Sequence, residues 1–153
     1  MVHLDEGFDF LGFNIRKYSG KTLIKPSKEA VKRITETVRE MTRSLCQAPT
    51  TEVIRHLNPA IKGWSTYYRG AVSSEIFASL DHYMWKRMWR WAVRRHPRKS
   101  KQWILDKYWG KYLYPARKDS WVFGDKETGK YLCKFAWTRI TRHIPVKGTV
   151  VQG

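Results

Sequence analysis

The sequence predicts a mainly helical protein of the α+β class, in which a three-helix bundle and a further short helix lie between two β-hairpins. Three observations predict this class. Apolar residues recur every three or four positions between residues 28 and 109, the period of an amphipathic helix. Short apolar segments beside glycine-containing turns occur before residue 26 and after residue 120. The 153 residues suffice for one domain or two small subdomains with a real core.

We expect three segments along the chain. They are a hairpin over residues 1–26, a helical domain over residues 27–110, and a C-terminal hairpin with a basic tail over residues 111–153. The first hairpin is predicted to have a strand over residues 8–15, a turn at Ser19-Gly20 and a return strand over residues 22–25. Apolar side chains lie on both faces of the first strand, so we expect it to be buried on both sides within a sheet.

The first two helical regions are delimited by capping residues and prolines. Ser27 is the expected N-cap of a helix over residues 28–45. The apolar seam of this helix consists of Val31, Ile34, Val38, Met41 and Leu45. A short helix should then run from Thr50 or Thr51 through His56. A new helix should begin at Asn58, with Asn58 as N-cap and Pro59 in the first turn, and end at Gly70.

The third helix is the longest, and its apolar residues fall on one face. It should begin at Ser73 or Ser74 and end at Pro97. On a helical wheel the buried face consists of Phe77, Leu80, Met84, Met88, Trp91 and Ala92. A fourth helix is predicted over residues 101–109, and a hairpin with strands over residues 121–123 and 131–135 and a turn over residues 124–129.

The net charge is the main indication of function. The chain has 30 Lys and Arg against 13 Asp and Glu, a formal charge of +17, which indicates a nucleic-acid partner or an anionic membrane surface. No apolar run approaches the roughly 18 residues of a membrane-spanning helix, so the weaker alternative is an interfacial helix over residues 76–95. The eight tryptophans exclude a disordered basic tail.

The long helix concentrates this charge, because no acidic residue occurs between Asp81 and Asp106. Like charges within two turns repel one another, and a polyanion would turn that cost into attraction. The predicted contacts to phosphate are Lys86, Arg87, Arg90, Arg94 and Arg95, extended past Pro97 by Arg98, Lys99 and Lys101, with Lys62 and Arg69 of the preceding helix as additions. Tyr83 and Trp89, within and at the border of this face, are the predicted stacking partners for unpaired bases.

The sequence predicts neither a catalytic centre nor a bound metal or cofactor. The carboxylates are dispersed, and Glu36 and Glu40 are expected to pair with Lys32, Arg33 or Arg43. No glycine-rich phosphate loop or catalytic nucleophile motif is present. Cys46 and Cys133 lie far apart in the chain, without the spacing of a zinc site, which indicates reduced thiols in a cytoplasmic protein.

Two sets of residues resemble a known family. The run over residues 57–64, followed by Tyr67-Tyr68-Arg69, resembles the maturase-specific domain of group II intron reverse transcriptases. The resemblance continues through Phe77, Leu80, Asp81, Trp85, Arg87, Trp89, Trp91, Arg94, Arg95, His96, Pro97, Lys101, Trp103, Tyr108 and Trp109. Phe10-Leu11-Gly12-Phe13 and Lys25-Pro26-Ser27 are similar to the last palm strands that lead into the thumb domain of those enzymes.

The resemblance implies an RNA-binding function within a mobile genetic element. In that family the thumb and maturase helices hold structured intron RNA and support RNA splicing and retrohoming, while a metal-binding Tyr-x-Asp-Asp element lies upstream in the palm. The 153 residues contain no such element. We therefore expect a non-catalytic, RNA-binding maturase fragment whose partner is group II intron RNA. Two alternatives remain: the C-terminal half of a split reverse transcriptase that is active only in trans with a palm-containing chain, and a degenerate remnant.

Overall fold

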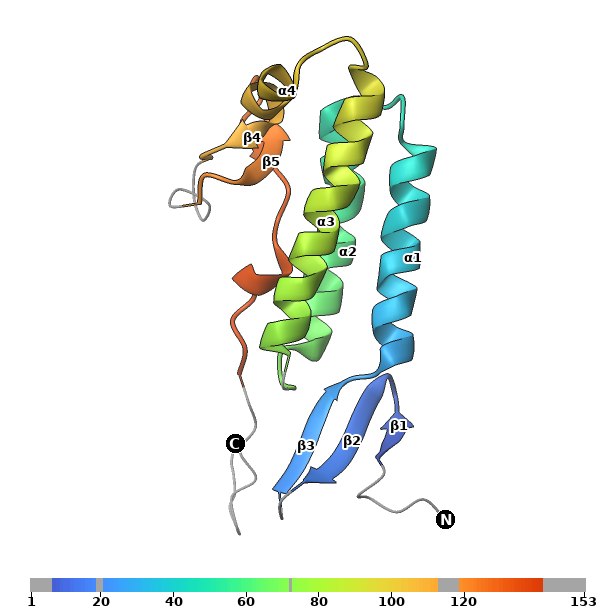
Figure 1. Ribbon diagram of the computed structural model, residues 1–153. Coiled ribbons are helices and arrows are strands. Elements are labelled where there is room, and N and C mark those ends of the chain that lie inside the picture. The colour runs from blue at the N-terminus through green and yellow to red at the C-terminus, as the bar shows by residue number, and fades with distance from the viewer. Residues whose placement is uncertain (1–6, 19–20, 72, 113–118, 142–153) are drawn as a thin grey trace.

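A computed structural model describes residues 7–18, 21–71, 73–112 and 119–141. Three long helices lie side by side, with a three-stranded sheet at one end of the bundle and a short helix beside a second small sheet at the other (Figure 1). The predicted mainly α fold of the α+β class is confirmed. The elements are β1 (Phe8–Phe10), β2 (Phe13–Tyr18), β3 (Lys21–Pro26), α1 (Lys28–Ser44), α2 (Thr50–Tyr68), α3 (Ser74–Arg95), α4 (Lys101–Tyr108), β4 (Trp109–Gly110), β5 (Val122–Asp125), β6 (Lys130–Tyr131) and the 3-10 helix η3 (Phe135–Trp137).

The N-terminal sheet has three antiparallel strands, so the prediction of one continuous strand over residues 8–15 was wrong. The chain reverses at Leu11 and Gly12, whose φ angles of 52° and 86° are both positive, as in the two-residue turns of tight hairpins. Phe10 consequently pairs with Phe13. The Ser27 amide donates to the Gly12 carbonyl at 2.8 Å, which joins this turn to the start of α1. The predicted turn at Ser19-Gly20 lies outside the described residues.

Substituting Gly12 should destabilise the protein, because a Cβ there would lie 2.4 Å from the Tyr68 hydroxyl oxygen and the positive φ strains an L-residue. We expect Gly12→Ala to lower the free energy of unfolding by about 1–3 kcal/mol in urea titrations followed by circular dichroism. Gly63→Ala is the matched control. Its Cβ would meet nothing within 4 Å on α2, and alanine should raise stability by about 0.5–1 kcal/mol. Equal stability of the two variants would refute the role of this turn.

The helix α2 is continuous where two helices were predicted, and Pro59 lies inside it. An internal proline costs about 3 kcal/mol of helix stability. Buried side chains on both sides of Pro59, among them the fully buried Leu57 and Ile61, offset that cost. Asn58 is therefore not an N-cap. Its side-chain amide donates to the Tyr131 carbonyl at 3.0 Å, and its side-chain oxygen accepts from the Cys133 amide at 2.7 Å.

The predictions for α1 and α3 agree closely with the structure. The Ser27 hydroxyl oxygen accepts from the Ala30 amide at 3.1 Å, which confirms it as the N-cap of α1. The predicted apolar face of α3 is its buried face, comprising Phe77, Leu80, Met84, Met88, Trp91 and Ala92. Ser73 occupies the N-cap position of α3, as predicted, but its side chain accepts no hydrogen bond from the first turn, and its hydroxyl donates to the Tyr68 carbonyl at 2.8 Å. None of the helices in the described part of the chain has the length and apolarity that crossing a membrane requires.

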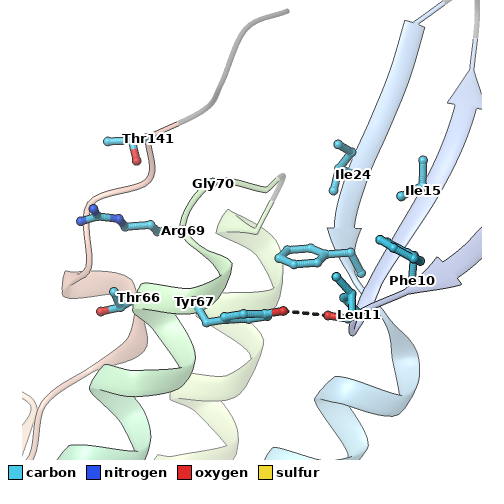
Figure 2. A pocket seen from close by; sticks show the side chains of 10 residues that line it. Phe10, Leu11, Ile15, Ile24, Thr66, Tyr67, Arg69, Gly70 and Thr141 are labelled. Carbon is cyan, nitrogen blue, oxygen red and sulfur yellow. Dashed lines mark hydrogen bonds between the residues drawn. The ribbon is translucent and has the colours of Figure 1, made fainter. Parts of the chain in front are cut away.

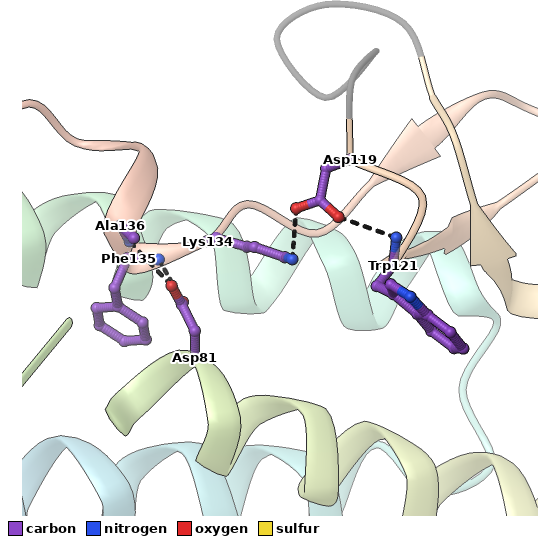
Figure 3. Close-up of polar contacts among 6 residues, drawn as sticks. All are labelled: Asp81, Asp119, Trp121, Lys134, Phe135 and Ala136. Atoms are coloured by element: carbon purple, nitrogen blue, oxygen red, sulfur yellow. Dashed lines mark hydrogen bonds and ion pairs between the residues drawn. The ribbon is translucent and has the colours of Figure 1, made fainter. Parts of the chain in front are cut away.

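The C-terminal segment packs back onto α2 and α3. The predicted hairpin is formed by β5 and β6, with β4 added as a third antiparallel strand through the pair Trp109 and Phe123. This pairing joins residues on the two sides of the expected boundary at residue 110, and the division into domains stays a prediction. Further along, the Asp81 carboxylate accepts from the Phe135 and Ala136 amides at 2.6 and 3.0 Å (Figure 3). Burial raises the pKa of Asp81, although these two bonds oppose the shift.

Candidate nucleic-acid interface

The helices α1 and α3 run parallel and are joined by side chains of α3 at every fourth position. The four donors are Tyr83, Arg87, Trp91 and Arg95. Their acceptors are, in order, the Thr35 carbonyl at 3.1 Å, the Thr42 hydroxyl at 3.1 Å, the Leu45 carbonyl at 3.0 Å and the Ala48 carbonyl at 2.6 Å. The last two bonds satisfy carbonyls at and beyond the end of α1 that have no partner within the helix. We call these four residues the α1-facing stripe.

This stripe divides the residues that the sequence predicts to contact phosphate. Arg87, Arg95 and the predicted stacking residue Tyr83 are partly buried and bond to α1 or to the residues that follow it. The guanidinium of Arg95 also lies 4.8 Å from the ring centre of Trp91. Lys86, Arg90 and Arg94 lie one position away on α3 and are exposed. We call these three the solvent-facing stripe, and they are the cations of α3 best placed for an external partner.

A groove of about 130 Å³ lies where the C-terminal half of α1 meets α3. Its lining consists of Thr42, Arg43, Cys46, Arg87, Arg90, Trp91 and Arg94, with no carboxylate among them. Burial lowers the pKa of Arg87, and the nearby charges of Arg90, Arg43 and Arg39 act in the same direction. The Nε atom of Arg87 is buried and has no hydrogen-bond acceptor among the described residues, which costs about 1–3 kcal/mol.

The sequence did not single out Arg39 and Arg43 as site residues. Arg43 was expected to pair with a glutamate of its own helix. In the described part of the chain, however, neither Glu36 nor Glu40 forms an ion pair with Lys32, Arg33 or Arg43, so that expectation was wrong. Exposed side chains on a helix gain little from such pairs. The spacing of four residues between Arg39 and Arg43 was the available signal, because it places both on one face of α1.

Beyond α3, the basic residues Arg98, Lys99 and Lys101 are all exposed, at the turn into α4 and in its first position. The indole of Trp103 lies beside them, 37% exposed, with the Lys99 Nζ atom 4.9 Å from its ring centre. The predicted stacking residue Trp89 is less available. It is partly buried, and it lies against Trp85 and Trp109 with ring centres 5.8 Å apart in each pair. Trp103 is therefore the more exposed of the two indoles.

The two predicted cations on α2 lie apart from the groove. Arg69 is exposed at the end of α2, close to the start of α3. The groove residue Arg94 is about 30 Å further along the axis of α3, given a rise of 1.5 Å per residue. Lys62 is also exposed, and it lies near Cys133 of the C-terminal segment. The structure thus brings the cations of α1 and α3 together and leaves those of α2 elsewhere.

A second surface feature is an open apolar groove of about 560 Å³ between the N-terminal sheet and the end of α2 (Figure 2). Phe10 and Leu11 are 58% and 70% exposed beside it, so the expected burial of this sheet on both faces was wrong. The Tyr67 side chain points toward the N-terminal sheet, and its hydroxyl donates to the Leu11 carbonyl at 2.9 Å (Figure 2). The lining residues are Phe10, Leu11, Phe13, Ile15, Ile24, Thr66, Tyr67, Arg69, Gly70 and Thr141.

The fold and the arginine-lined groove define a basic helical domain suited to a polyanionic partner. Among the described residues no three side chains of His, Cys, Asp or Glu come together as metal ligands would.

The sequence model of the group II intron maturase-specific domain matches residues 31–109, which include most of α1 and all of α2, α3 and α4. Because this match covers more than half of the chain, the protein belongs to that family. No curated protein matches its sequence. The assignment points to a function related to group II intron maturases.

Proposed function

We propose that this protein is a maturase-type RNA-binding protein that holds structured group II intron RNA along α3 and supports splicing or retrohoming without a catalytic centre of its own. The observation that carries this proposal is the convergence of cations from two helices. Arg43 of α1 joins Arg87, Arg90 and Arg94 of α3 around one groove that no carboxylate lines. Such an arrangement is costly in isolation and favourable against a polyanion.

The proposed mechanism of RNA binding assigns a different role to each of the two stripes of α3. The α1-facing stripe holds the two helices in register, so the arginines of the groove keep fixed positions relative to one another. The solvent-facing stripe and the residues after Pro97 would bind backbone phosphates, which confers affinity without reading sequence. Discrimination for intron RNA would come from its shape and from an unpaired base stacked on Trp103.

The test is binding of the full chain to a folded group II intron RNA across a salt series from 50 to 200 mM. If the three residues of the solvent-facing stripe each bind a phosphate, they alone contribute about −2 to −3 to the slope of log affinity against log salt, and the residues after Pro97 make the slope steeper. The protein should also increase the splicing rate of that intron. An unfolded RNA of equal length is the control, and it should bind more weakly. A flat salt response would overturn the proposal.

The exposed N-terminal sheet favours a second candidate, in which the chain completes a reverse transcriptase by binding a palm-containing chain. That partner would cover the apolar groove beside Leu11. In this case DNA synthesis should require both chains, and Leu11→Asp should abolish it. The substitution places a charge on the proposed contact, and aspartate tolerates the positive φ of this position better than leucine does. Synthesis that is unaffected by Leu11→Asp, or independent of the second chain, would refute the candidate.

A further inference from the structure

We propose that the groove between α1 and α3 is a binding site for a single phosphate group, and that in the bound RNA it holds one internal phosphodiester. This inference deepens the proposed function and rests on it. The size of the groove is the first argument. Its volume of about 130 Å³ is well below the roughly 300 Å³ at which pockets for drug-sized ligands begin, so it suits a small group better than a nucleoside.

The charge around the groove is the second argument, because it selects an anion. Four arginines line it, namely Arg43, Arg87, Arg90 and Arg94. The nearby C-terminus of α1 contributes only about half a negative charge. Moreover, the carbonyls there at Leu45 and Ala48 already accept hydrogen bonds from α3. The balance is strongly positive, and the planar fork of arginine matches the oxygens of a phosphate.

The third argument concerns the guanidinium of Arg87, which is held by a hydrogen bond to Thr42 and has one N–H group, at Nε, without an acceptor in the described part of the chain. Thr42 donates its hydroxyl proton to the Arg39 carbonyl at 3.0 Å, so its oxygen is free to accept from Arg87. Thr42 is therefore a positioning residue. The Nε atom of Arg87 is buried and remains without an acceptor among the described residues, so a small shift of this side chain on anion binding would give it one of the acceptors that an oxyanion carries.

The surroundings favour an internal phosphate over a terminal one. Lys86, Arg90 and Arg94 continue along the exposed side of α3, and the basic turn after Pro97 follows them. A polynucleotide can therefore enter and leave the groove along one line of cations. A chain bound by its terminal phosphate would extend from the groove in one direction only and would contact only the cations on that side.

The first experiment compares two substitutions on α1 that remove the same charge. Arg43→Gln removes a residue of the groove, whereas Arg33→Gln removes an exposed arginine ten positions earlier. We expect Arg43→Gln to weaken binding of intron RNA about tenfold and Arg33→Gln less than about twofold, since one charge-assisted contact is lost only in the former. Equal losses would overturn the phosphate site and leave RNA binding intact. Absence of RNA binding by the wild-type chain would instead overturn the proposed function.

The second experiment detects the site without RNA. Inorganic phosphate should shift the Nε–Hε resonance of Arg87 saturably in the wild-type chain and in Arg33→Gln, but not in Arg43→Gln, whereas chloride at equal ionic strength should not. No saturable shift, or the same shift in Arg43→Gln, would overturn the site. Oligonucleotides with and without a 5′-phosphate should compete equally, and a strong preference for the 5′-phosphate would overturn the assignment to an internal phosphodiester.

Discussion

Phe135→Ala is expected to lower the free energy of unfolding by about 3–5 kcal/mol, the range for removing a fully buried aromatic ring. Phe135 is 1% exposed, and its ring centre lies 5.8 Å from that of Trp64 on α2 and 6.5 Å from that of Phe77 on α3. It is therefore the side chain through which the C-terminal segment enters the core of the helical bundle. Urea unfolding followed by circular dichroism at 222 nm measures the change.

The matched control for this prediction is Trp121→Ala, which also removes a large aromatic side chain from the C-terminal segment. Trp121 is 52% exposed, so we expect a loss below about 1 kcal/mol. If Phe135→Ala were no more destabilising than this control, the C-terminal segment would not contribute to the stability of the bundle. Asp81 should then be a weak contact as well, since it binds the backbone at Phe135 and Ala136.

Replacing the solvent-facing stripe with alanine should reduce the affinity for intron RNA by about 3 kcal/mol, or roughly a hundredfold, at about 1 kcal/mol for each lost phosphate contact. The variant combines Lys86→Ala, Arg90→Ala and Arg94→Ala. The slope of log affinity against log salt should become less negative by about 2–3. Filter binding or fluorescence anisotropy across the salt series measures both quantities. Arg87 is left in place because its loss would also break a contact between α1 and α3.

The control for this variant removes three exposed cations in β3 and in the first turns of α1, at the end of α1 away from the groove, through Lys25→Ala, Lys28→Ala and Lys32→Ala. The net charge changes equally in the two variants, so a purely global electrostatic effect predicts equal losses. We expect the control to lose less than about tenfold. Equal losses would show that net charge alone determines affinity, and an unchanged affinity in the α3 variant would exclude α3 as the interface.

The faces of α3 could be predicted from the sequence because they depend on a period of 100° per residue within one helix. Its buried face was predicted correctly, from Phe77 to Ala92. The division of its cations could not be predicted in this way. Arg87 and Arg90 lie on neighbouring parts of the wheel, yet only Arg87 bonds to α1. That difference depends on where α1 lies, and the position of α1 cannot be inferred from the periodicity of α3.

The errors elsewhere arose where a local signal was overridden or absent. Pro59 is a strong local signal for a helix start, and the burial of Leu57 and Ile61 outweighs it. Leucine is an uncommon turn residue, so the sequence signal at Leu11-Gly12 was weak. Hydrogen bonds from Tyr67 to the Leu11 carbonyl and from Ser27 to the Gly12 carbonyl hold that turn.

The sequence by itself determined the mainly helical class of the fold, the N-cap at Ser27 and the buried face of α3. It also determined the excess of positive charge and the resemblance to the maturase-specific domain. These features depend on composition and on residues close together in the chain. Only the tertiary structure decided which cations face the solvent and which hold the bundle together. The reason is that the hydrogen bonds from α3 to α1 and to the residues after it join positions 45 to 49 residues apart, and the groove that contains Arg43 exists only where those two helices meet.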